Sequence, residues 1–283
     1  MDDAKIYKEV TTDFECEELQ SDLDNVLWWC SENEMELNIS KCVVLSFSRR
    51  TNVTVFNYTL FGSTLHRSST VKDLGVTVSS NLSPEPHLRN ISKKAYSALG
   101  FVVRMSRDGF SPHALRTLYV QLVRPLLEYC SPVWSPYLIC HVDLLEGVQR
   151  RFLRVLGVSL SFHCLEVPLD EMERRFGLLP LSSRRKIFDL LLLKKIITAS
   201  VDSPELLSRV DFRCAREVRS RGLFERAHCS TQYSYHSALP RLHRLGNSLP
   251  SYIDLIQFSE NRLRKELTNF YSSEECMFDF FFN

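Results

Sequence analysis

The sequence predicts an α+β fold, with a few antiparallel strands and one helix over residues 1–80 and a mainly helical region after them. β-Branched and apolar runs are concentrated in the first 80 residues, as is typical of strands. From His87 onward, apolar residues recur every three or four positions, as they do on amphipathic helices. Pro84 and Pro86 mark the change, because proline is favoured at the start of a helix.

In the first 80 residues the pattern predicts one helix over 13–37, which Asn38 and Ser40 end. Its apolar face carries residues at helical spacing: Leu19, Leu23, Val26 and Cys30. Three strands are predicted at 41–48, 53–60 and 69–79.

Three helices are expected to form a bundle over residues 81–157, at 87–107, from Pro112 to near Pro125, and at 141–156. Their predicted inward residues are Ile91, Ala95, Ala98, Leu99, Val102, Leu115, Leu118, Tyr119, Leu122, Val123, Leu144, Leu145, Val148, Phe152, Val155 and Leu156. Further helices are predicted at 169–176, at 182–199 with Ser182 as N-cap, and at 259–271. Residues 208–250 lack a clear period and are expected to be rich in loops.

The charge is unevenly distributed along the chain. Residues 1–50 hold 12 acidic and 5 basic residues, a net charge of −7, whereas residues 51–200 hold 19 basic and 11 acidic residues, a net charge of +8. Residues 201–283 are balanced at 11 of each. A basic middle section suits a phosphate-rich partner, although solvated helix faces also carry arginine routinely.

The nine cysteines form no Cys-x-x-Cys pair, and the chain starts with acidic residues rather than a signal peptide. No run of about 18 apolar residues is present that could cross a membrane. These features favour reduced thiols in a nuclear or cytoplasmic protein that is not secreted and has no membrane partner.

Several motifs together resemble a known family. These motifs are WWCSENEMELN at 28–38 with Lys41 after it, KDLGV at 72–76, LYVQLVRPLLEYCSPVW at 118–134, QRRFLR at 149–154 and Asn247-x-Leu-Pro. They are similar to segments of non-LTR (LINE-type, jockey-like) retrotransposon reverse transcriptases. The order of these motifs corresponds to the C-terminal portion of such an enzyme, starting at the palm Asp-Asp motif. The resemblance implies a partial polymerase palm over 1–80, a helical thumb-like bundle over 81–157 and a C-terminal region over 158–283.

The resemblance implies a remnant catalytic site at Asp2, Asp3 and Lys41. Nucleotidyl transfer uses two divalent ions, and Mg²⁺ requires hard oxygen ligands such as carboxylates. In this family a third aspartate from an earlier palm strand completes the site, so Asp2 and Asp3 form an incomplete Mg²⁺ site that is not expected to hold the ion stably. On residue chemistry alone, Asp2 and Asp3 are a solvated terminus and Lys41 is a surface lysine.

The resemblance also implies an RNA template and a DNA primer duplex as partners. Residues expected to contact that duplex, mostly through its phosphates, are Lys72, Gly75, Arg89, Lys93, Lys94, Arg104, Arg150, Arg151 and Arg154. Gly75 would admit a close backbone, although Leu-Gly-Val alone indicates only a bend in a strand. Tyr119, Tyr129 and Trp134 are predicted to be core or capping residues rather than platforms for bases.

The sequence gives little support for a zinc site, a phosphate-binding loop or a serine nucleophile. Cys130, Cys140, His141, His163 and Cys164 are zinc-ligand types, but their spacing fits no compact zinc module. No glycine-rich phosphate loop or serine-nucleophile motif occurs.

The sequence therefore predicts a catalytically incomplete fragment of an RNA-directed DNA polymerase that retains surfaces for template and primer. The rival prediction is a non-catalytic helical scaffold that binds nucleic acid or protein. A third possibility is a product that is not stably made, because the strands of residues 1–80 would lack sheet neighbours.

Overall fold

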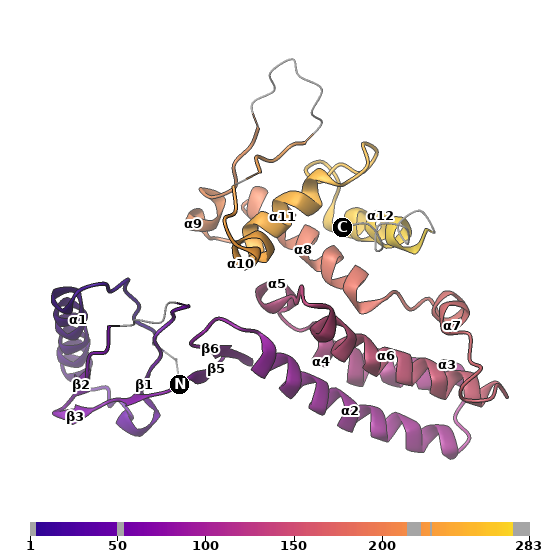
Figure 1. The fold of residues 1–283 in the computed structure, drawn as a ribbon, viewed down its shortest axis with the longest axis horizontal. Helices are drawn as coiled ribbons and strands as arrows, with labels where there is room; N and C mark the ends of the chain where they lie inside the picture. The colour runs from indigo at the N-terminus through magenta and orange to yellow at the C-terminus, as the bar shows by residue number, and fades with distance from the viewer. Residues whose placement is uncertain (1–3, 50–53, 214–221, 227, 274–283) are drawn as a thin grey trace. The chain divides into compact units, whose positions relative to one another are not determined.

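The structure is a computed structural model that describes residues 4–49, 54–213, 222–226 and 228–273. The chain forms two compact units, Met1–His87 and Leu88–Asn283, which we call unit 1 and unit 2 (Figure 1). The predicted boundary at 80 lies seven residues before this division, and the one at 157 lies within unit 2. Of the helices in the described residues, none combines the length and hydrophobicity needed to cross a membrane.

Unit 1 holds one helix and short strands. In chain order these are α1 (Asp13–Glu32), the 3₁₀ turn η1 (Ile39–Lys41), β1 (Val43–Val44), β2 (Thr59–Leu60), β3 (Ser63–Thr64), β4 (His66–Arg67), β5 (Thr70–Asp73) and β6 (Val76–Ser79). They form three two-stranded sheets: β1 with β4 in parallel, and β2 with β3 and β5 with β6 antiparallel.

Helix α1 starts at a capping box in which the Thr12 hydroxyl accepts from Glu15 N–H and the Glu15 carboxylate accepts from Thr12 N–H. Its predicted end near Asn38 is wrong. The helix stops at Glu32 because Asn33 donates its side-chain amide to the Trp29 carbonyl and Glu34 takes a positive φ of 54°. The predicted apolar face is confirmed: its four members are buried or half-buried.

The predicted strands are longer than those observed. Of 41–48 only β1 is a strand, and of 53–60 only β2 within the described residues. The expected strand over 69–79 is a hairpin, because Leu74 and Gly75 both have positive φ (44° and 87°) and form a two-residue turn between β5 and β6. The side chain of Gln20 on α1 joins the helix to β2 by exchanging two 2.9 Å hydrogen bonds with the backbone of Thr59.

Unit 2 contains most of α2 (Glu85–Arg107) and all later helices. The predicted helix over 87–107 is confirmed, starting two residues earlier. Its predicted inner residues are buried, apart from half-buried Ala98.

The second helix does not stop near Pro125 as predicted. Residues 112–128 are helical throughout, as α3 (Pro112–Leu118), the π-helical turn η2 (Tyr119–Val123) and α4 (Arg124–Glu128). Within an α-helix the Pro125 ring would meet the Gln121 carbonyl, and the wider π turn, closed by Arg124 N–H to Tyr119 O, makes room for it. The turn also places buried residues four apart, at Leu115, Tyr119, Val123 and Leu127, so that Leu122, predicted to be inward, is 45% exposed.

After the short α5 (Ser131–Trp134), α6 (Ile139–Ser159) contains the predicted helix at 141–156. The predicted inward residues of α6 are buried or half-buried. Helix α7 (Leu169–Phe176) matches its prediction, and α8 (Leu181–Ile197) nearly does.

The expected N-cap of α8 at Ser182 is wrong. Pro180 occupies the N-cap position and has no capping side chain. The Glu146 carboxylate of α6 caps α8 instead, accepting from the backbone N–H groups of Leu181 (3.1 Å) and Ser182 (2.6 Å).

The C-terminal part packs on α8. Its elements are α9 (Pro204–Leu207), α10 (Gln232–His236), α11 (Ala238–Asn247) and α12 (Glu260–Ser272), the last confirming the helix predicted at 259–271. The loop-rich prediction for 208–250 missed α11, because Pro240 and Gly246 obscure its period. Side chains of α8, α11 and α12 share a core with Phe224, Ile253 and Leu255.

Candidate nucleic-acid interface

Helix α2 carries a basic stripe along its exposed side. This stripe contains four exposed cations, Arg89, Lys93, Arg104 and Arg107. Their spacings of 4, 11 and 3 residues place them on nearly the same side of the helix. Lys94 is also exposed but lies about 100° around the helix from Lys93. The stripe therefore holds three of the four α2 cations predicted to bind nucleic acid, together with Arg107.

Helix α6 presents the second group of predicted cations. Arg151 and Arg154 are exposed. Arg150 instead pairs with Asp143, at 3.2 Å between Nη1 and Oδ1, and also donates to the Asp143 carbonyl. Part of the charge of Arg150 is therefore compensated within its own helix.

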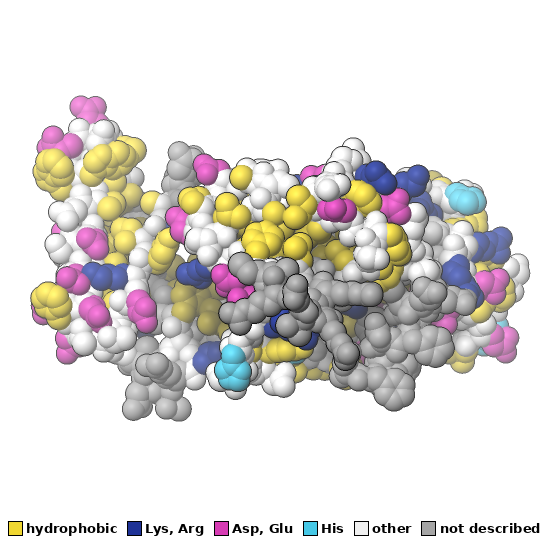
Figure 2. All heavy atoms as spheres, turned by 90° about the horizontal axis from the view of Figure 1, so that it is seen from above, with side chains coloured by type: hydrophobic (Ala, Val, Ile, Leu, Met, Phe, Trp, Pro, Cys, Tyr) yellow, Lys and Arg dark blue, Asp and Glu magenta, His cyan; other side chains and the backbone are white. Residues whose placement is uncertain are grey.

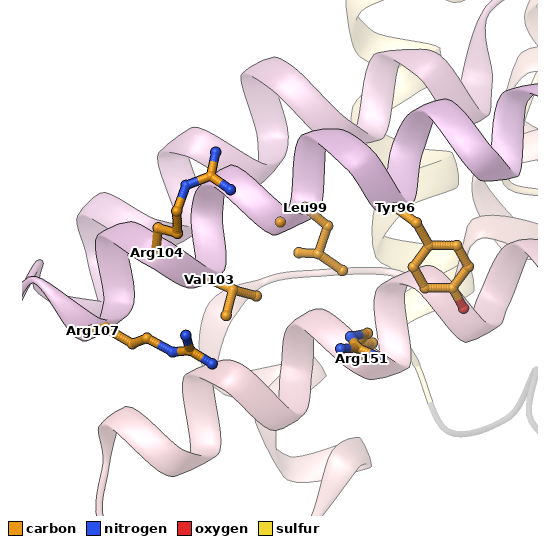
Figure 3. Close-up of a pocket in the computed structure, with 7 residues that line it drawn as sticks. Tyr96, Leu99, Val103, Arg104, Arg107 and Arg151 are labelled. Carbon is orange, nitrogen blue, oxygen red and sulfur yellow. The ribbon is translucent and has the colours of Figure 1, made fainter.

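A groove of about 560 Å³ brings the two helices' cations together (Figure 3). Its lining combines apolar and basic residues: Tyr96, Leu99, Gly100, Val103, Arg104, Arg107 and Arg151. Figure 3 shows Val103 and Arg107 pointing from α2 toward α6, with Arg151 on α6 facing them. Two of the predicted residues, Arg104 and Arg151, thus line one site.

The groove has an uncompensated positive charge. Within the described residues, no carboxylate lies at ion-pair distance from Arg104, Arg107 or Arg151. Figure 2 shows several Lys and Arg side chains gathered toward the right-hand end of that view. Guanidinium groups of this kind bind phosphates through several fixed donors.

A buried hydrogen-bond chain holds the inner side of α6 in place. The Tyr119 hydroxyl donates to Gln149 Oε1 at 3.0 Å, and Gln149 Nε2 donates to the Leu179 carbonyl at 2.9 Å. The Tyr119 ring also stacks on Phe152, with centroids 4.1 Å apart. Because α6 is fixed on its inner side, the position of Arg151 on its outer side is fixed as well.

The same chain reaches Glu173 of α7, whose carboxylate accepts from Gln149 Nε2 at 3.1 Å. Burial raises the pKa of Glu173 to about 7, while the hydrogen bond from Gln149 opposes this and the nearby Glu146 carboxylate adds to it. Glu173 is therefore a titratable group beneath the basic face rather than part of it.

The predicted residues of unit 1 do not gather into one site. Lys41 ends η1 directly before β1, and Lys72 lies on β5, both exposed. Gly75 is at the tip of the β5–β6 hairpin. The Lys5 ammonium meets the Asp73 carboxylate there at 2.5 Å, which places the start of the described chain beside this turn.

Asp2 and Asp3 lie outside the described residues. Within the described ranges, no three His, Cys, Asp or Glu side chains are grouped so that they could hold a metal ion. The zinc-ligand types Cys130, Cys140, His141, His163 and Cys164 all lie within these ranges.

The aromatic predictions are confirmed. Tyr119 and Trp134 are buried, and Trp134 Nε1 donates to the Tyr129 carbonyl at 2.9 Å. Tyr129 is 58% exposed but occupies the C-cap position of α4, so it is a capping rather than a core residue.

Sequence reasoning missed the groove, although it predicted two of the lining residues, Arg104 and Arg151, as contacts with nucleic acid. Tyr96, Gly100 and Val103 line it and were not predicted as site residues. A glycine in the middle of a long amphipathic helix was the available signal, because such a glycine usually has a packing or functional reason.

Comparison with known proteins gives one distant similarity. The chain is 23% identical over 141 residues to a Drosophila melanogaster protein described as "Probable RNA-directed DNA polymerase from transposon BS". The match covers 49% of this chain and 16% of that protein. No family model matches the chain. No solved structure matches it either. The similarity supports a relationship to transposon RNA-directed DNA polymerases.

Proposed function

We propose that this chain is part of a non-LTR-type reverse transcriptase and binds nucleic acid through the basic face formed by α2 and α6. The observation that carries the proposal is the groove lined by Arg104, Arg107 and Arg151, none of which has a carboxylate at ion-pair distance among the described residues. The D. melanogaster protein named as an RNA-directed DNA polymerase agrees with this assignment. A duplex of RNA template and DNA primer is the partner we propose.

Within this proposal, residues 1–80 correspond to part of a polymerase palm, residues 81–157 to a thumb-like bundle and residues 158–283 to a C-terminal region. Element order supports the correspondence, since α1 and short strands precede the helices of unit 2. The tip of the β5–β6 hairpin, with Lys72 and Gly75, is a second proposed contact with the duplex.

The carboxylates of Asp2 and Asp3, which would supply hard oxygen ligands to Mg²⁺, lie outside the described residues. Since the match spans 16% of the relative, we propose that nucleotide transfer requires more of the polymerase than this chain supplies. Primer extension on an RNA template with Mg²⁺ tests this, and incorporation by the isolated chain would refute it.

Binding is tested with a labelled RNA–DNA hybrid, by fluorescence anisotropy at a series of salt concentrations. Because each neutralised phosphate releases counterions, the affinity should fall steeply as salt rises. Absence of binding at low salt would overturn the proposal.

One observation favours a second function, contact with another protein. Apolar side chains around α5 are open to solvent, with Val133 67% and Ile139 80% exposed. Hybrid binding that does not change with salt would favour this scaffold role over phosphate contacts.

A further inference from the structure

The groove between α2 and α6 is not only basic but amphipathic. Leu99 and Val103 give it an apolar floor, and Arg104, Arg107 and Arg151 supply the charge. A site that met only a phosphate backbone would need the cations and not the apolar floor. A lining that is partly apolar and partly cationic is complementary to a ligand with a flat, weakly polar part and an anionic part.

Gly100 gives the groove its depth. A Cβ added at Gly100 would meet nothing within 4 Å, so the space beside the backbone is open. Glycine weakens the interior of a helix relative to alanine, and α2 continues through Gly100 without a break. Because Gly100 has no side chain, the space over Leu99 and Val103 is open, and a larger residue at position 100 would fill it.

Tyr96 bounds the groove at one end. Figure 3 shows its ring reaching from α2 toward α6, and its hydroxyl oxygen lies 3.2 Å from where a Cβ at Gly147 would be. The ring is 39% exposed, so part of it is available for contact. Aromatic faces next to cationic side chains are the elements with which proteins hold unpaired bases.

We infer that the groove holds one unpaired nucleotide of a bound strand, with the base against Leu99, Val103 and Tyr96 and its phosphate on Arg107 and Arg151. This rests on the proposed function, because the strand itself is bound by the basic face. The volume of about 560 Å³ lies within the range of about 300–1,000 Å³ typical of pockets for small ligands. An unpaired nucleotide is the occupant that fits, because a base already out of the stack costs least to place in a pocket.

The test compares two RNA–DNA hybrids, one continuous and one with a single unpaired adenosine in the DNA strand, for binding to the whole chain. The chain should bind the bulged hybrid at least about fivefold more tightly, since stacking one base on an aromatic side chain gives a gain of this order. Gly100→Leu should fill the groove while leaving its three arginines in place. In this variant the bulge preference, measured as the ratio of the affinities for the two hybrids, should disappear. Gly100→Ala is the matched control, because it also strengthens the helix but adds one methyl group; part of the preference should survive.

The outcomes separate this inference from the proposed function. If the chain binds both hybrids equally, or if Gly100→Leu keeps the full preference, the nucleotide site is refuted. Nucleic-acid binding by the basic face is then still supported. If the chain binds neither hybrid, the proposed function is wrong, and this inference falls with it. Circular dichroism of each variant checks that the helix content of the chain is retained.

Discussion

Gly157 of α6 faces Val167 so closely that a Cβ at position 157 would stand 2.4 Å from Val167 Cγ1. Val167 is buried in the turn before α7, so it has little freedom to move away. The absence of a side chain at Gly157 therefore allows the segment leading to α7 to pack against the end of α6.

Gly157→Ala should destabilise the protein by about 1–3 kcal/mol, the usual cost of forcing an extra methyl group into a packed interior. Denaturant unfolding measures the change. Gly100→Ala is the control, because its Cβ is unobstructed and it should stabilise by about 0.5–1 kcal/mol. The double variant Gly157→Ala with Val167→Ala should recover part of the loss, and equal effects at both glycines would contradict this packing.

Arg150 and Arg151 are neighbours on α6 but should differ in binding. Arg150 pairs with Asp143, whereas Arg151 lines the groove with its charge uncompensated. Arg151→Gln should weaken hybrid binding severalfold and lower the salt slope by about 1, while Arg150→Gln should have a smaller effect. Asp143→Asn should strengthen binding, because it releases Arg150. Equal losses for the two arginine variants would argue against the groove as the site.

Glu173 should make stability depend on pH. Its pKa rises from 4.5 to about 7 on folding because the carboxyl group is buried, so between these values the folded state holds a proton that the unfolded state has lost. The stability contributed by this group is full below pH 4.5 and is lost as pH rises through 7.

Glu173→Gln keeps an acceptor for the Gln149 amide and removes the titration. The difference in unfolding free energy between this variant and the parent should therefore grow in favour of the variant from pH 5 to pH 8. Chemical denaturation at several pH values measures it. Other titrating groups, including buried His243, are common to both proteins and cancel in the difference. A difference that is constant with pH would show that Glu173 is charged throughout.

Asn247 is expected to stabilise the C-terminal part of unit 2 rather than bind a ligand. Its side chain accepts from Phe224 N–H and donates to the Phe224 carbonyl, both at 2.8 Å, which ties the loop to α11. Asn247→Ala should cost about 1–3 kcal/mol, because the Phe224 backbone would be left without its partners. Exposed Asn269 on α12 is the matched control, and Asn269→Ala should change the unfolding free energy by less than about 0.5 kcal/mol.

Sequence reasoning succeeded where a local pattern determines the structure. The buried residues of α2 repeat at helical spacing over about four turns, so the bounds of α2 were predicted to within two residues at its start. The predicted starts of α1 and α12 are likewise set locally, since the hydroxyls of Thr12 and Ser259 each accept from an N–H three residues ahead.

It failed where distant residues decide the structure. Glu146 caps α8 from α6, and no pattern near Ser182 reveals this. Pro125 normally ends a helix, and only the π turn before it lets the helix continue. The groove needs α2 and α6 side by side, so spacing along either helix alone could not show that Arg104, Arg107 and Arg151 line one groove.

The most direct test of the central claim is the salt dependence of hybrid binding for two charge-matched triple variants. The first variant lacks the groove's cations and carries Arg104→Gln, Arg107→Gln and Arg151→Gln. The second lacks three exposed cations outside the groove and carries Arg209→Gln, Arg226→Gln and Lys265→Gln. If nucleic acid binds along α2 and α6, the first set should lower the slope of log affinity against log salt by about 3, at about 0.9 per phosphate contact, and the second set should leave the slope nearly unchanged. Equal slopes for the two sets would contradict the claim that nucleic acid binds along α2 and α6.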